Sequence, residues 1–421
     1  RPPGASCFMP IDPRISTRNV SLRSDQLREL IAAQPKGCAL QQAFYSDPSI
    51  YALDMERIFM SRWLCVGHES RIPNNGDFFV HAVAGESLII IRGRDAVVRA
   101  LVNVCRHRGS EVCYEKEGNA KVLVCPYHAW AYELDGSLRA ARQMNESIDK
   151  SEYGLARIHL KILEGVIFVC FADDPPKLTD AEATLRKSLG HYGWADAKVA
   201  HRAVYSVDAN WKLAVENYFE CYHCGPAHPE FARHHATETF LDPKVKALRE
   251  NTRARAREMG IEIDETSNWP WPGAPGEESV DAFPDATYPG SVTGSEDGQA
   301  VAPLMGDFTA YDGGFSYVDV GPASSFLAYP DYGVMYLFIP RDIQSTDMEI
   351  IWLVAKDAKE GVDYELDRLI WMWDVTSIAD KKIIDHNQRG VNSRYYRPGP
   401  YSPMENMPKD MTEWYLEQIT P

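Results

Sequence analysis

The chain has 421 residues and a formal net charge of -16 at pH 7, with 45% hydrophobic, 11% aromatic and 25% charged residues. This composition is typical of an ordinary globular protein, and the length predicts two domains rather than a single core. The negative charge argues against general nucleic-acid binding, which needs a basic footprint, and no run of about eighteen apolar residues predicts a membrane span.

The cysteines and the first residues bear on the compartment. The chain has nine cysteines, an odd number, and their spacing is not that of a small secreted disulfide framework. The opening RPPGASCFMP lacks the apolar stretch of a signal peptide. We therefore expect a reducing, cytoplasmic location, with no membrane anchor and no nucleic-acid partner.

The first part of the chain predicts two elements of organisation. Apolar residues recur at helical spacing in residues 24–34 and 48–63, so a helical arm is expected over residues 1–60. From 61 to 175 the pattern changes to short alternating segments separated by Gly, Asn and Asp, which predicts a small all-β domain. Its expected strands lie within residues 78–83, 87–93, 97–104, 121–128, 130–136 and 167–172.

The remainder, residues 176–421, mixes helical and strand patterns and predicts an α+β domain. Antiparallel strands are expected within residues 313–320, 323–330, 332–340 and 348–356, and helices within 180–189, 211–223, 364–389 and 411–419. Residues from about 265 to 310 are rich in Pro and Gly. They predict a loop insertion on the substrate side or at an interface, because the stretch is too long for a simple connection.

Two cysteine and histidine pairs carry the clearest chemical signal. Cys105-x-His107 and Cys125-x-x-His128 are separated by seventeen residues, and each pair follows a predicted strand. Two thiolates on one iron and two imidazoles on the other define a Rieske [2Fe–2S] cluster. Opposed loop tips would keep the cysteines inside and the histidines exposed. Zinc is the alternative occupant, because it accepts the same donors.

A second group of polar residues lies in the string ENYFECYHCGPAH, where Glu220, His223 and His228 are three and five residues apart. At the end of a helix, both histidines can point toward one centre, and Glu220 would share a helix face with His223. Two histidines with one carboxylate hold Fe(II) and leave positions open for oxygen and substrate. The alternative is that the histidines are ordinary core or surface groups.

Cys221 and Cys224 lie on either side of His223 and form a C-x-x-C pair that could bind zinc or act in redox chemistry. On one helical turn beside a metal we interpret them as packing residues instead. Aromatic residues at 315, 317, 326 and 329 recur at strand spacing, and we expect them in the core rather than around a substrate.

The chain resembles the Rieske non-haem iron oxygenases in the order and spacing of its four cluster ligands. The strings NVCRHRGS, CPYHAWAYELDG, ENYFECYHC and NQRGVNSRYYRPGPYS are similar to the branch that oxidises quaternary amines such as glycine betaine, carnitine and choline. The likeness runs from about residue 40 to 420 and is weakest between about 240 and 350. It implies a Rieske domain over 61–175 and, over 176–421, a helix-grip catalytic domain with an antiparallel sheet and a long C-terminal helix.

The resemblance also implies site residues. The third iron ligand of the family stands on the long C-terminal helix, eight residues before a glutamine, which indicates Asp380 before Gln388. Asp374 and Asp385 remain alternatives on the same helix. Asn217 is a further candidate catalytic residue.

In this family a ring of three subunits places the cluster of one subunit against the iron of the next, and a carboxylate joins the two. Glu220 occupies that position and would connect His128 of a neighbour to His223. Most ring-hydroxylating members have Asp there, so Glu is a departure shared with the quaternary-amine branch.

The implied activity is that of an oxygenase component. It would use dioxygen and electrons from a flavin/[2Fe–2S] reductase to hydroxylate an N-methyl group of a quaternary ammonium or betaine-like substrate, with release of formaldehyde. Within the enzymes, the alternative is the α subunit of an aromatic ring-hydroxylating dioxygenase. Outside them, the alternatives are an electron-transfer Rieske protein and a zinc-binding structural protein.

Overall fold

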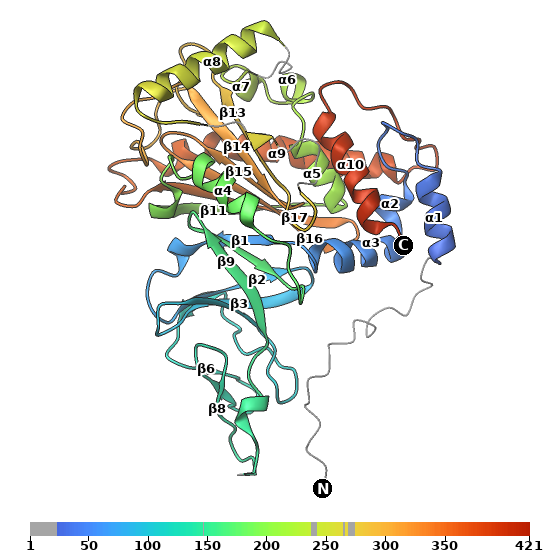
Figure 1. Cartoon of the computed structure of the whole chain (residues 1–421), viewed down its shortest axis with the longest axis vertical. Coiled ribbons are helices and arrows are strands. Elements are labelled where there is room, and N and C mark those ends of the chain that lie inside the picture. The colour runs from blue at the N-terminus through green and yellow to red at the C-terminus, as the bar shows by residue number, and fades with distance from the viewer. Residues whose placement is uncertain (1–22, 146, 237–241, 264–265, 268–273) are drawn as a thin grey trace.

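The structure is a computed structural model that describes residues 23–145, 147–236, 242–263, 266–267 and 274–421. One part of the molecule is built of strands, and the other is a second sheet covered by helices (Figure 1). The helical arm comes first in the chain, and its last turn, Met55–Phe59, contacts the C-terminal helix α10 (Asn406–Ile419). The arm consists of α1 (Ser24–Ala32), α2 (Ala43–Ser46), α3 (Pro48–Asp54) and that π-helical turn.

The N-terminal domain is all β, as its alternating pattern predicts. Its seven-stranded antiparallel sheet has the order β1 (Leu64–His68), β10 (Val166–Cys170), β9 (Arg157–Leu163), β4 (Val98–Val102), β3 (Glu86–Arg92), β2 (Asp77–Val83), β5 (Glu117–Asn119). A smaller sheet of β6 (Leu123–Val124), β7 (Ala131–Tyr132) and β8 (Leu138–Ala140) extends away from the catalytic part (Figure 1). On β3, Ile89 and Ile91 face the core under this small sheet.

The C-terminal domain is built on a second seven-stranded antiparallel sheet. Its order is β11 (Ala197–Val207), β17 (Ser345–Ala355), β16 (Gly333–Asp342), β15 (Ser324–Ala328), β14 (Gly314–Val320), β13 (Val280–Ala286), β12 (Thr266–Ser267). The other helices of this half are α4 (Thr179–Ser188), α5 (Trp211–Tyr218), α6 (Cys224–Ala227), α7 (Pro229–Ala232), α8 (Pro243–Glu258) and α9 (Leu366–Val391). The expected α+β architecture with a long C-terminal helix is confirmed.

Both faces of this sheet are covered, which explains why β16 and β17 are continuous apolar runs rather than alternating ones. On β16, Tyr336 and Phe338 pack in one cluster with Trp373 of α9. Leu337 and Ile339, one residue out of phase, pack in the other cluster with Leu185 of α4. The sheet therefore supports α5 and α9, the two helices that position the site.

Two expectations about local structure are wrong. The helix expected over residues 211–223 ends at Tyr218, so Glu220 and both histidines follow it in turns and short helices. Part of the expected loop insertion, residues 280–286, forms β13 and pairs along its whole length with β14. Because of Pro284, the sequence pattern of this segment predicted a loop rather than a strand. Among the residues that the structure describes, β12 pairs with β13 only at Asp281 and Ala282, so Pro284 has no described strand on that side that would need its missing N–H.

A buried ion pair connects the arm to α5. The Lys212 ammonium contacts the Asp54 carboxylate, and both side chains are fully buried. Asp54 also accepts hydrogen bonds from Tyr415 Oη at 2.7 Å and Trp211 Nε1 at 3.0 Å. Burial alone raises the pKa of Asp54 and lowers that of Lys212, so each charge depends on the other.

In the described residues, no helix combines the length and apolar character needed to cross a membrane.

Replacing Lys212 by methionine is expected to lower the free energy of unfolding by about 3–5 kcal/mol, because the Asp54 carboxylate loses its counter-charge in a dry site. Denaturant titration followed by tryptophan fluorescence measures the change. Arg186→Met is the matched control, because Arg186 pairs with Glu182 at an exposed site and should change stability by only about 0–1 kcal/mol. Equal effects of the two substitutions would contradict the role of the buried pair.

Candidate functional site

Two loops of the N-terminal domain hold the predicted cluster ligands: Cys105 and His107 between β4 and β5, and Cys125 and His128 between β6 and β7. The loops repeat one backbone pattern. The Cys105 N–H donates to the Ser110 carbonyl at 2.8 Å, and the Cys125 N–H donates to the Trp130 carbonyl at 2.8 Å. Each cysteine is thus fixed at the start of a closed six-residue turn, so the two loops present their donors in an equivalent way.

Burial separates the two kinds of donor as expected. Cys105 and Cys125 are 3% and 1% exposed, whereas His107 and His128 are half-buried, with ring centroids 4.6 Å apart. Nδ1 of His107 is buried and has no hydrogen-bond partner in the described part of the chain, as suits a nitrogen that binds metal. The Tyr132 hydroxyl lies 3.2 Å from Sγ of Cys105. These donors fit a Rieske cluster, whose potential depends on hydrogen bonds to sulfur.

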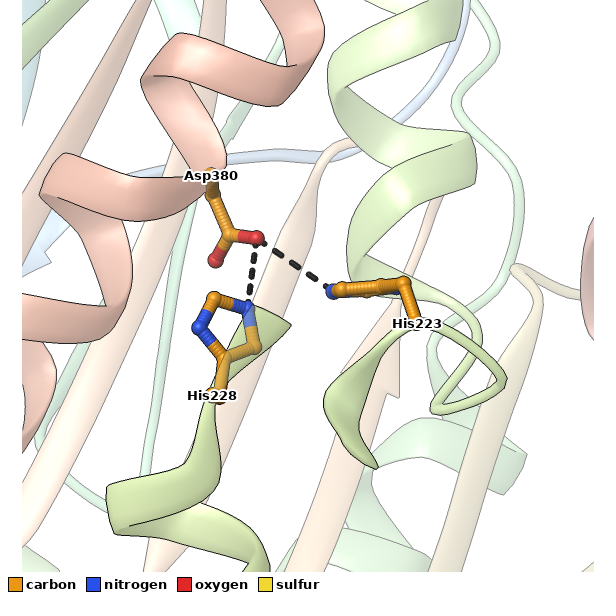
Figure 2. Close-up of side chains that lie close together, drawn as sticks. All are labelled: His223, His228 and Asp380. Carbon is orange, nitrogen blue, oxygen red and sulfur yellow. Dashed lines mark hydrogen bonds and ion pairs between the residues drawn. The ribbon is translucent and has the colours of Figure 1, made fainter. Parts of the chain in front are cut away.

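A second constellation lies in the C-terminal domain, where His223, His228 and Asp380 converge (Figure 2). Nε2 of His228 is 2.8 Å and Nε2 of His223 is 3.3 Å from Oδ1 of Asp380. The three ligand atoms lie within 4.8 Å of one another. Two imidazoles and a carboxylate at this separation fit the facial triad of a mononuclear Fe(II) site.

Local sequence explains why the two histidines can meet. His228 precedes Pro229, and the residue before a proline is disfavoured in the helical conformation. His228 accordingly adopts φ -128 and ψ 64, which ends α6 and starts α7 in a new direction. The chain therefore folds back at His228, and the two imidazoles face each other with centroids 5.1 Å apart.

The alternative carboxylates on α9 point elsewhere. Oδ1 of Asp374 accepts a hydrogen bond from Tyr205 Oη at 2.5 Å. Asp385 accepts from the backbone N–H of Asp208 at 2.7 Å and from Lys381 Nζ at 3.0 Å. Six and five residues are not whole helical turns, so neither group shares the face of Asp380. The structure brings only Asp380 of these three to the histidines.

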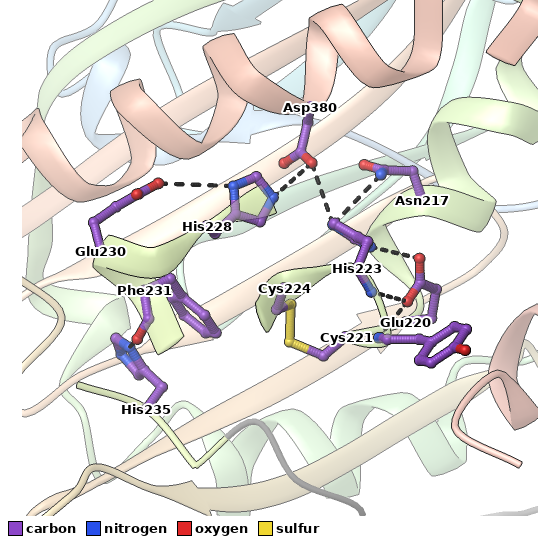
Figure 3. Close-up of a disulfide and its surroundings, with 11 residues drawn as sticks. Asn217, Glu220, Cys221, His223, Cys224, His228, Glu230, Phe231, His235 and Asp380 are labelled. Carbon is purple, nitrogen blue, oxygen red and sulfur yellow. Dashed lines mark hydrogen bonds and ion pairs between the residues drawn. A yellow bond between two sulfur atoms is a disulfide. The ribbon is translucent and has the colours of Figure 1, made fainter. Parts of the chain in front are cut away.

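Glu220 orients His223 from the side opposite Asp380. Its Oε1 lies 2.5 Å from Nδ1 of His223, and its Oε2 accepts from the His223 backbone N–H at 3.1 Å (Figure 3). With Nδ1–H donating to the carboxylate, Nε2 keeps its lone pair for a metal. Asn217 Nδ2 is 3.5 Å from that same Nε2, at the limit of a hydrogen bond.

Cys221 and Cys224 form a disulfide (Figure 3). The interpretation of these two cysteines as unbonded packing residues is therefore wrong. That interpretation assumed one continuous helix, whereas the helix ends at Tyr218 and the chain turns, which brings the Cα atoms to 4.8 Å. The bond closes the turn that contains His223, with Glu220 at its entry.

A cavity of about 410 Å³ opens beside the three converging side chains. Phe315 and Tyr317 of the four aromatic residues expected in the core line this cavity, whereas Phe326 and Tyr329 are buried in the clusters behind it. The wall residues that sequence reasoning missed include Asp281, Phe283, Asp285 and Asp319. The signal for three of them was present as the two-residue alternation D-x-F-x-D in VDAFPDA, within the segment expected to be a loop.

The two halves of the chain match two family models, and they do so in the order that the fold shows. Residues 62–161 match the Rieske [2Fe-2S] domain, and residues 194–420 match the catalytic domain of the ring hydroxylating alpha subunit. The chain therefore belongs to the Rieske non-haem iron oxygenases, as an oxygenase (α) subunit with domains for a [2Fe–2S] cluster and a mononuclear iron.

Its relatives narrow the class to monooxygenases. The glycine betaine monooxygenase oxygenase subunit of Pseudomonas aeruginosa is 34% identical over 400 residues, 93% of this chain and 91% of the relative. The subunit of the same name from Chromohalobacter salexigens is 35% identical over 412 residues, 97% and 90% of the two chains. Among solved structures, the quaternary ammonium Rieske monooxygenase CntA is similar, with a TM-score of 0.70 and 25% sequence identity. The match covers 95% of this chain and 99% of the CntA chain. The CntA structure gives insights into carnitine oxidation and inter-subunit electron transfer.

Proposed function

We propose that this monooxygenase hydroxylates an N-methyl group of a quaternary ammonium or betaine-like substrate and so removes that methyl group as formaldehyde. The observation that carries the proposal is the position of His223, His228 and Asp380 at a cavity with aromatic and carboxylate walls. A quaternary ammonium cannot donate hydrogen bonds and is held by aromatic faces and opposite charge. The names of the two glycine betaine relatives and of CntA support the same substrate class.

In this proposal His223, His228 and Asp380 hold the mononuclear iron, and Cys105, His107, Cys125 and His128 hold the cluster. When bound, the cluster supplies electrons and the iron activates dioxygen. Asp380 balances positive charge, Glu220 fixes the ring of His223, and Asn217 offers a polar contact beside Nε2. The apolar and aromatic walls keep bulk water away from the reacting methyl group.

The reaction balances with one dioxygen, two electrons and two protons. One oxygen atom enters a C–H bond of the N-methyl group, and the other leaves as water. The N-hydroxymethyl product then breaks its C–N bond, leaves the electron pair on nitrogen, and releases formaldehyde and a proton.

Electron supply depends on two partners in this proposal. The cluster loops border the small sheet that extends away from the catalytic domain, whereas the proposed iron ligands belong to the catalytic domain (Figure 1). Electrons would therefore come from an adjacent subunit of a homotrimer, with Glu220 connecting His223 to His128 of the partner subunit. A flavin/[2Fe–2S] reductase that oxidises NAD(P)H would charge the cluster, and a cytoplasmic location is part of the proposal because the reductase would need NAD(P)H there. Inter-subunit electron transfer in CntA supports this arrangement.

The test is formaldehyde release from a panel of N-methyl compounds and aromatic acids, with a reductase supplied. We expect one formaldehyde per dioxygen consumed with quaternary ammonium substrates, and no product from aromatic acids. Formation of dihydroxylated rings from the aromatic acids, with no formaldehyde from any ammonium compound, would make the chain a ring-hydroxylating dioxygenase instead.

A further inference from the structure

The far wall of the cavity is formed by cross-strand pairs of β13 and β14. Asp281 lies opposite Asp319, and Phe283 lies opposite Tyr317. These residues recur every second position, so their side chains point to one face of the sheet, the face that lines the cavity. The rings of Phe283 and Tyr317 are stacked with centroids 4.9 Å apart. The wall thus presents an aromatic surface next to a pair of carboxylates.

The two carboxylates are an unusual choice for this position. Asp281 and Asp319 are 4% and 3% exposed, and like charges directly across two strands repel each other. Oδ1 of Asp319 is buried and makes no hydrogen bond of full geometry within the described residues, although the Ser325 hydroxyl is near enough to lower the pKa of this carboxyl and the side chain lines the cavity. A buried carboxylate oxygen of this kind normally has a partner. A cation in the cavity would provide one.

The charge of the rest of the wall favours a cation without a carboxylate of its own. Away from the proposed iron ligands and Glu220, the described residues that line the cavity include three carboxylates and one guanidinium, that of Arg249. Nε of Arg249 is 3.1 Å from Oδ1 of Asp285, so its charge is already opposed. A zwitterion would bring a carboxylate into an acidic cavity, whereas a simple ammonium ion would lower the repulsion.

We propose that the cavity binds an ammonium compound of net positive charge, with its cationic group against Asp319 and the Phe283–Tyr317 pair. This inference rests on the proposed N-demethylation and narrows its substrates from betaines to cations that carry no carboxylate. Tyr218 and Tyr336, whose ring centroids are 5.0 Å apart, both line the cavity and extend the aromatic surface. The cationic head can therefore lie on aromatic faces as well as beside the carboxylate.

Proton linkage gives the proposal an independent signature. Burial raises the pKa of Asp319 to about 8; the Ser325 hydroxyl opposes this rise, and the neighbouring Asp281 adds a smaller one. The other titratable groups near it are Tyr317 on its own strand and Tyr218 on α5, and the pKa values of both tyrosines are raised, chiefly by burial. A bound cation lowers the pKa of Asp319, so binding near pH 7 should release protons and binding near pH 9 should not.

The experiment measures binding to the holoenzyme by calorimetry without reductant, so that no turnover occurs. The probes are choline, its uncharged isostere 3,3-dimethylbutan-1-ol, and glycine betaine. We expect choline to bind at least about tenfold more tightly than either of the others, since one unit charge near a buried carboxylate is worth that much. Tighter binding of glycine betaine than of choline overturns the proposal with the unmodified protein alone.

Asp319→Asn should weaken choline binding by about 10- to 100-fold and abolish proton release, while 3,3-dimethylbutan-1-ol binds as before. The matched control is Asp312→Asn, because Asp312 is also a buried carboxylate near the start of β14 but does not line the cavity. Unchanged choline binding in Asp319→Asn overturns the proposal. Formaldehyde from glycine betaine with no effect of Asp319→Asn refutes only this inference. Choline binding that needs Asp319, with no formaldehyde from any ammonium compound, refutes only the proposed function.

Discussion

Replacing Asp380 by alanine is expected to empty the mononuclear iron site and to abolish formaldehyde formation, while the absorption spectrum of the cluster stays unchanged. Both histidine Nε2 atoms face Oδ1 of Asp380, so the substitution leaves two neutral nitrogens and no charge to offset the metal. Loss of an outer partner alone costs about 10- to 100-fold in metal affinity, and loss of a direct ligand should cost more than about 100-fold. Iron per subunit, normalised to the cluster spectrum, measures the effect.

Asp374→Ala is the matched control for this prediction. Asp374 is on the same helix but bonds to Tyr205, so its removal should leave the iron content unchanged. Full iron content in Asp380→Ala would contradict the ligand assignment. Loss of iron in Asp374→Ala with retention in Asp380→Ala would move the ligand along the helix.

Glu220→Gln is expected to retain both metals and to slow electron transfer between them by about 10- to 100-fold, the range found when a partner of a metal-bound histidine is removed. Glutamine nearly preserves the shape of the side chain but loses its charge. It has one acceptor oxygen where the carboxylate has two, so it cannot offer a separate oxygen to each imidazole. The measurement is a single turnover, in which the chemically reduced protein is mixed with oxygen and substrate and the reoxidation of the cluster is followed.

Glu230→Gln separates a connecting role from a local one. Oε1 of Glu230 lies 3.7 Å from Nδ1 of His228, so this glutamate accompanies the other histidine of the triad. We expect it to change the single-turnover rate much less than Glu220→Gln does. Equal slowing by both would mean that Glu220 only orients His223, and an unchanged rate in Glu220→Gln would end its assignment as the connection.

The parts of the site that could be predicted are those encoded locally. The proposed cluster donors fall within 24 residues, and their spacing alone indicates a metal with mixed ligands. His223 and His228 are likewise close in the chain. Asp380 is 152 residues after His228 and has no local signal, so only resemblance to a family indicated it.

Other features depend on contacts that no local pattern contains. The helix over residues 211–223 was expected to be continuous because apolar residues repeat up to Phe219, yet it ends at Tyr218, and the disulfide and Glu220 lie beyond its end. The strand that carries Asp281 and Asp285 was missed because a proline such as Pro284 indicates a loop, unless one side of the strand is known to be unpaired at that position among the described residues. Which strand forms the edge is decided by the whole sheet.

The buried junction of Asp54, Lys212 and Tyr415 has a consequence for how such chains can diverge. Its members come from the arm, from α5 and from α10, segments distant in sequence that meet in one dry site. A chain in which Lys212 is substituted keeps a destabilising buried carboxylate until Asp54 is substituted as well. Single substitutions at these positions are therefore disfavoured, and paired substitutions are tolerated. Among relatives, these positions should therefore vary together, and the identity of residue 54 should report on residue 212.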